Sequence, residues 1–156
     1  MTITREVRRY TKMCMVLAIL AGASSVAAGH DPYRIKSLKG DAYRGPDSFR
    51  VTVRYDVRIK DYDPKAEYEL ILYLTEEGRP LQDQEGQPLQ QVVRLRQPEI
   101  NKKGEARFVG QAEGDIAVGL VQNAKHLRVQ ATLFFVGDNR PLATKQTGLK
   151  VHKKPS

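Results

Sequence analysis

Hydrophobic and polar residues alternate in three segments of the chain, without a break in the first of them, and this alternation predicts β-strands. The longest run covers twelve residues, from Phe49 to Lys60. A period of two places β-branched and aromatic side chains on one face and charged side chains on the other, which is typical of a strand between a core and water. The segment from Glu67 to Thr75 alternates in the same way, and we expect it to pair antiparallel with the first. The third segment runs from His126 to Val136.

Weaker patterns around these segments predict further strands. Gly137-Asp138-Asn139 supplies a turn after the third segment, so Leu142 to His152 is expected to return as the last strand of a hairpin. Ile116 to Ala124 remains open between a strand and one short helical turn. The other candidate strands are Arg34 to Leu38, Gln90 to Arg96 and Glu105 to Gln111.

About seven to eight short strands without sustained helical periodicity predict an all-β fold. The expected architecture is an antiparallel two-layer β-sandwich of immunoglobulin-like type. We expect the sandwich to cover residues 49–152, after an N-terminal extension with a possible first strand at 28–48 and before a basic tail at 153–156.

The N-terminal residues have the pattern of a secretory signal peptide. Four cations and one anion within the first twelve residues precede an apolar stretch from Met13 to Ala21, which fades into small residues. We expect residues 1–27 to be removed, with cuts after 28 or 29 as alternatives, and the protein to be secreted or periplasmic. The apolar run is shorter than a membrane span, so membrane contact is expected only through the signal peptide; a retained anchor is the alternative.

The charge balance changes once this segment is set aside. The whole chain has 26 Lys and Arg against 18 Asp and Glu, a net charge of +8, which at first suggests binding to nucleic acid. Without residues 1–27 the net charge is +5 over 129 residues, and Cys14, the single cysteine, is gone. Because export separates the protein from nucleic acid and no aromatic stacking platform accompanies the cations, we do not expect a nucleic-acid partner.

The remaining residues offer little material for catalysis, so we expect no enzymatic activity. The serines are Ser37, Ser48 and Ser156, and none lies in a Gly-x-Ser-x-Gly context. The histidines 126 and 152 are expected to be plain surface residues at strand ends. No pair of histidines has metal-ligand spacing, and no cofactor is expected, apart from copper in the alternative that follows.

His30 provides the one metal hypothesis. A cut after residue 27 would make His30 the third residue, and an amino group, two amide nitrogens and an imidazole form a square-planar set that suits Cu(II). A cut after residue 29 would make His30 the first residue. Either position would suit an exported copper-handling protein.

The most organised polar feature is a cationic row on the predicted strand from Phe49 to Lys60. Its members are Arg50, Arg54, Arg58 and Lys60. Such a row could lie along an anionic polymer. The alternative is a solvated sheet face on which carboxylates, Glu67 and Glu69 among them, neutralise the cations.

Together these patterns predict an exported, non-enzymatic β-sandwich that serves as a binding or structural module of the periplasm or cell envelope. An envelope protein or a polysaccharide is the expected partner. The alternatives are copper handling through His30 and binding of an anionic polymer through the cationic row.

Overall fold

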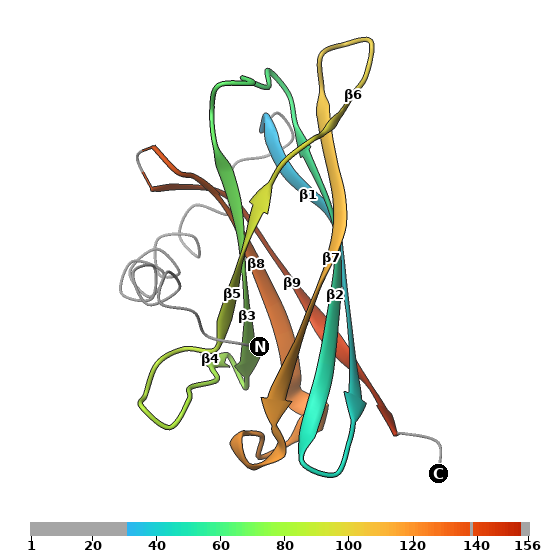
Figure 1. Ribbon diagram of the computed structural model, residues 1–156, viewed down its shortest axis with the longest axis vertical. Coiled ribbons are helices and arrows are strands. Elements are labelled where there is room, and N and C mark those ends of the chain that lie inside the picture. Colours follow the sequence, from blue (N-terminus) through green and yellow to red (C-terminus); the bar gives the residue numbers. More distant parts are fainter. Residues whose placement is uncertain (1–30, 138, 154–156) are drawn as a thin grey trace.

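The computed structural model describes residues 31–137 and 139–153, which form two facing β-layers (Figure 1). Layer 1 contains β1 (Tyr33–Arg44), β2 (Ser48–Ile59), β6 (Glu99–Ile100) and β7 (Ala106–Ala117). Layer 2 contains β3 (Tyr68–Glu76), β4 (Arg79–Pro80), β5 (Gln90–Leu95) and β8 (Leu127–Phe135). One core of buried side chains from both layers fills the space between them. The predicted all-β sandwich is confirmed, with nine strands in the described part of the chain.

The last strand, β9 (Arg140–Lys153), belongs to both layers. Its first half runs antiparallel to β8 in layer 2, and its second half, from Leu149 onward, runs parallel to β1 in layer 1. This parallel pairing departs from the purely antiparallel prediction. At the crossing, Gly40 lies opposite Leu149, and a Cβ on Gly40 would come within 2.6 Å of the Leu149 Cδ2. The absent side chain lets the second half of β9 approach β1.

The strand with the longest alternation is β2, and its expected core face is buried. Six side chains fill it: Phe49, Val51, Val53, Tyr55, Val57 and Ile59. However, β2 pairs with β1 and β7, whereas β3 lies in layer 2 between β5 and β8. The predicted pairing of β2 with β3 is therefore wrong. The eight residues between them, 60–67, form a connection that crosses between the layers instead of a tight hairpin.

Both faces of β3 are buried. Tyr68, Leu70, Leu72 and Leu74 enter the main core, as the alternation predicts. On the opposite face, Ile71 and Tyr73 form a second small cluster with Phe134 of β8. This face was expected to be solvated, so sequence alternation predicted the direction of these side chains but not their burial.

The strand β7 extends well beyond the segment that its sequence pattern predicted. Three of its inward positions are Gly110, Ala112 and Gly114. Glycine has no side chain and alanine only a methyl group, so these positions weaken the alternation of apolar and polar residues. A Cβ on Gly110 would overlap the phenol of Tyr55 on the neighbouring β2, so the glycine makes room for that ring. Ile116 lies near the end of β7, and short 3-10 turns at Val118–Leu120 and Ala124–His126 follow. The segment from Ile116 to Ala124 is therefore not a separate strand.

The contact between Gly110 and Tyr55 generates a stability prediction. Gly110→Ala forces the Tyr55 ring to move within a packed core, and it should lower the free energy of unfolding by roughly 1–3 kcal/mol. The matched control is Gly148→Ala, because Gly148 is an exposed strand glycine, and a Cβ added there would have no atom within 4 Å. Urea denaturation measures both. Equal stability of the two variants would contradict this account of Gly110.

Candidate functional site

The arginines of the cationic row all have carboxylate partners. The Arg54 guanidinium lies 3.1 Å from an Asp41 oxygen on β1, and Arg50 lies 3.8 Å from Glu113 on β7. Arg58 contacts Asp56 at 3.4 Å and Glu105 at 3.8 Å. The outer face of layer 1 is thus charge-paired across its strands.

These partners differ from the ones that the sequence suggested. Glu69 lies in layer 2, where its carboxylate is 3.3 Å from Arg94 of β5, because β3 does not pair with β2. The carboxylates that meet the arginines come from β1, from β7 and the turn before it, and from Asp56 on β2 itself. The regular alternation along β7 was the signal that could have revealed Arg107 and Glu113 as members of the same face.

Asp56 is the centre of this network. Its carboxylate accepts hydrogen bonds from Arg107 at 3.2 Å and from Arg58 at 3.4 Å, and only 9% of the residue is exposed. Burial raises the pKa of Asp56, but the hydrogen bonds and charges of Arg107 and Arg58 outweigh it and hold the pKa below its ordinary value. Arg107 also approaches Glu99 at 3.9 Å, which extends the network to β6.

Both described histidines are partly exposed, and each contacts a carboxylate. His152 lies 2.9 Å from Asp41 and stacks on Tyr43 with ring centroids 4.8 Å apart. The hydrogen bond from His152 is the main cause that lowers the pKa of Asp41. His126 lies 2.8 Å from Glu77. These contacts hold the end of β9 against β1 and the start of β8 against the turn after β3.

No metal site is formed by the residues that the structure describes. Within them, no three His, Cys, Asp or Glu side chains gather closely enough to hold an ion. His30 lies outside the described residues, so copper binding stays a prediction from the sequence.

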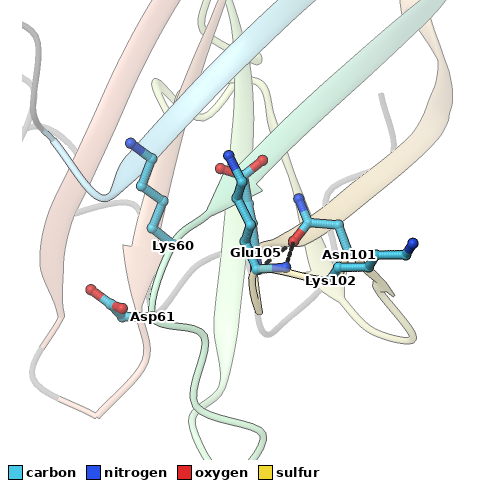
Figure 2. A pocket seen from close by; sticks show the side chains of 6 residues that line it. Lys60, Asp61, Asn101, Lys102 and Glu105 are labelled. Carbon is cyan, nitrogen blue, oxygen red and sulfur yellow. Dashed lines mark hydrogen bonds between the residues drawn. The ribbon is translucent and has the colours of Figure 1, made fainter.

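Lys60, the last member of the row, lies in a different setting. It follows the end of β2 and borders a hollow of about 660 Å³ at the end of layer 1. We call this the lysine hollow, and its lining residues are Lys60, Asp61, Asn101, Lys102, Lys103 and Glu105 (Figure 2). A smaller hollow of about 250 Å³ adjoins it, shares Lys60 and Glu105, and adds Arg34 and Arg58.

Local backbone structure places the lysines around the lysine hollow. The Lys60 N–H donates to the carbonyl of Pro32 at 2.8 Å, which ties the end of β2 to the start of β1. The turn between β6 and β7 is closed by Asn101, whose side-chain oxygen accepts from the backbone N–H groups of Lys103 and Glu105 (Figure 2). Gly104 completes the turn at a φ of +78°, a conformation that favours glycine. Lys102 and Lys103 are therefore fixed at the tip of this turn.

The lining of the lysine hollow contains three lysines and two carboxylates, Asp61 and Glu105, which gives a formal net charge of +1. No carboxylate among the described residues lies within 4 Å of the ammonium groups of Lys60, Lys102 or Lys103. Figure 2 shows Lys60 and Glu105 on facing segments, with Lys102 turned outward. Sequence reasoning identified Lys60 but missed Lys102 and Lys103. The signal was the turn sequence Asn-Lys-Lys-Gly, which presents two cations at a tip.

The Asp56 network generates a prediction on acid stability. Asp56→Asn removes the partner of Arg58 and Arg107 and should lower the free energy of unfolding at pH 7 by roughly 1–3 kcal/mol. Because the pKa of Asp56 is lowered in the fold, its contribution is present above the ordinary value of 3.8 and is lost as the pH falls through the lower folded value. The difference between variant and wild type should therefore shrink below pH 3.8.

Glu113→Gln is the control for this prediction, since it breaks the exposed pair with Arg50 and should change stability by less than about 1 kcal/mol. Thermal or urea unfolding between pH 7 and pH 2 measures all three proteins. A constant difference between Asp56→Asn and wild type over this range would refute the assignment.

The structure holds no helix within residues 31–137 and 139–153 that has the length and hydropathy needed to cross a membrane. No family model matches the sequence, and no curated protein matches it either. Similar proteins are found among solved structures.

Among solved structures, the chain is similar to part of the β-glucuronidase 2 of Bacteroides uniformis and to HBP35 of Porphyromonas gingivalis. The first likeness has a TM-score of 0.51 at 12% identity and covers 74% of this chain and 14% of that one. The second has a TM-score of 0.51 at 14% identity and covers 92% of this chain and 48% of that one. A domain of the outer membrane lipoprotein Omp28 from Porphyromonas gingivalis is similar at a TM-score of 0.44, too low to carry an argument.

This chain spans less than half the length of either of the first two proteins. At such identities the likenesses show the fold alone, a β-rich sandwich that recurs as a domain within larger bacterial proteins.

Proposed function

We propose that this protein is an exported, non-enzymatic β-sandwich module of the periplasm or cell envelope that binds an anionic polysaccharide at the lysine hollow. One observation carries the proposal: Lys60, Lys102 and Lys103 line one hollow and have no carboxylate within 4 Å among the described residues, whereas Arg50, Arg54 and Arg58 of the same layer are paired. Unneutralised cations around a concavity concentrate positive potential and attract anions.

The dimensions and chemistry of the lysine hollow suit sugar acids. A volume of about 660 Å³ lies within the usual range of ligand sites and accommodates a short stretch of a polysaccharide. Lysine ammonium groups are mobile point charges, so they tolerate carboxylate, phosphate or sulfate groups spaced along a chain. Asp61 and Glu105 supply acceptors for sugar hydroxyl groups. The side-chain oxygen of Asn101 already accepts from the turn backbone, so its side-chain nitrogen supplies a donor.

The same lining supports a binding role over a catalytic one. No serine, cysteine or histidine lines the lysine hollow, so it lacks the Ser-His or Cys-His pair of acyl-transfer enzymes. Of its two carboxylates, Glu105 is engaged with Arg58 at 3.8 Å. A secreted or periplasmic location is supported by the N-terminal signal pattern.

The arginines and the lysine of the cationic row have different roles in this proposal. Arg50, Arg54 and Arg58 stabilise the outer face of layer 1 by pairing with carboxylates. Lys60 contributes to ligand binding together with the two lysines of the turn between β6 and β7. We therefore place the anionic polymer at the end of β2, and not along the cationic row as the sequence suggested.

Charge reversal tests the lysine hollow directly. The triple variant Lys60→Glu, Lys102→Glu and Lys103→Glu should reduce affinity for polygalacturonate and for sulfated dextran by at least about tenfold, and the wild-type affinity should fall as salt increases. Isothermal titration calorimetry in low and high salt measures both effects.

A second triple variant provides the control with the same net charge. It reverses three exposed lysines of β1 and β9, namely Lys39, Lys145 and Lys150. This control should bind nearly as well as wild type. Equal losses in the two triple variants would show that only net charge matters, and an unchanged affinity in the first triple would remove the lysine hollow as the site.

A further inference from the structure

One edge of layer 1 is open along most of β7. The strand pairs with β2 at every position from Ala106 to Ala117, without a register shift. On its other side, β6 pairs only with Ala106 and Arg107. Among the described strands, none pairs with the segment from Phe108 to Gly114 on that side. Figure 1 shows β6 near the top of β7.

The direction of the backbone groups on this edge follows from the turn before it. The Asn101 N–H donates to the Glu105 carbonyl at 3.1 Å, so Glu105 directs its carbonyl toward the β6 side. Successive residues of a strand direct their N–H and C=O groups to opposite sides. Val109, Gln111 and Glu113 therefore present N–H and C=O groups at the open edge, ready to pair with an added strand.

The segment from Phe108 to Gly114 has few of the features that protect natural sheet edges, and Glu113 is its single charged residue. It contains no lysine, no proline and no bulge. Its Val109 side chain is 61% exposed on the outer face. An unprotected edge of this kind is a template for pairing with a further strand.

The segment is complementary to a second copy of itself. In an antiparallel pair centred on Gln111, Phe108 lies opposite the partner's glycine at position 114, and Gly110 lies opposite its alanine at 112, so large residues meet small ones. Val109 lies opposite a glutamate, and the two copies of Gln111 face each other. Such a glutamine pair already exists in this protein, where Gln146 donates to Gln130 directly across β8 and β9 at 2.7 Å.

Charge also favours this arrangement. Arg107 is at one end of the segment and Glu113 is near the other, so antiparallel pairing brings the basic end of each copy toward the acidic end of its partner. We propose that two copies of this chain associate by antiparallel pairing of their β7 edges, centred on Gln111, to form one continuous sheet from two copies of layer 1.

The first test removes one edge N–H. Gln111→Pro deletes a backbone donor that faces away from β2, so the fold should survive while the dimer dissociates to monomer. Gln111→Ala is the matched control and should remain dimeric. Sedimentation velocity of the purified full chain gives the mass, and circular dichroism checks the fold. A wild-type chain that stays monomeric at its highest soluble concentration would overturn the proposal. Pairing of β7 with a strand of another protein would not support it, because the proposed partner is a second copy of this chain.

A second test keeps the proposal falsifiable if the proline variant fails to fold. Val109 is exposed, so Val109→Glu and Val109→Lys should both leave the monomer folded. In the proposed register, position 109 faces the partner's glutamate at 113. The glutamate variant should weaken dimerisation by about tenfold and the lysine variant should preserve or strengthen it. Equal effects of the two variants, or no effect of either, would contradict this register.

Discussion

The register of β2 against its two neighbours determines which charges meet on the outer face of layer 1. Asp41 of β1 and Glu113 of β7 come within reach of Arg54 and Arg50 because the pleat sends these side chains to the same face. Asp56 receives two arginines in the same way. Where β2 ends, at Ile59, this cross-strand compensation also ends, and Lys60 lies beyond it. The separation of the paired arginines from the lysines that we propose to bind a ligand therefore follows from where β2 ends.

The same strand links the fold to the proposed site. The core face of β2 holds layer 1 against layer 2, while its last residues fix Lys60 beside the turn between β6 and β7. Asn101 makes that turn rigid through two hydrogen bonds, so the lysines at its tip are presented from a defined backbone. A binding surface carried by turns at the end of a rigid sandwich is a common way for this architecture to gain function.

Much of the fold could be predicted from the sequence, because β2 alternates strictly and β3 and β8 carry large apolar residues at alternate positions. The length of β7 could not, since its core positions are occupied by Gly110, Ala112 and Gly114, which carry little hydropathy. The pairing of strands was also beyond local pattern, and the mistaken pairing of β2 with β3 assigned the wrong carboxylates to the arginines. Of the three lysines at the proposed site, the sequence pattern indicated Lys60, which belongs to the cationic row. Lys102 and Lys103 are distant in sequence and come next to Lys60 only in the folded chain.

The central claim is that anions bind at the end of layer 1 and not along the cationic row. The most direct measurement is a titration of the isotope-labelled protein with polygalacturonate, followed by amide chemical shifts. The account predicts that the largest shifts fall at residues 31–34, 58–61 and 101–105, which line the two hollows or adjoin them. Shifts that instead follow Arg50 and Arg54 along β2, or that show no clustering, would contradict it.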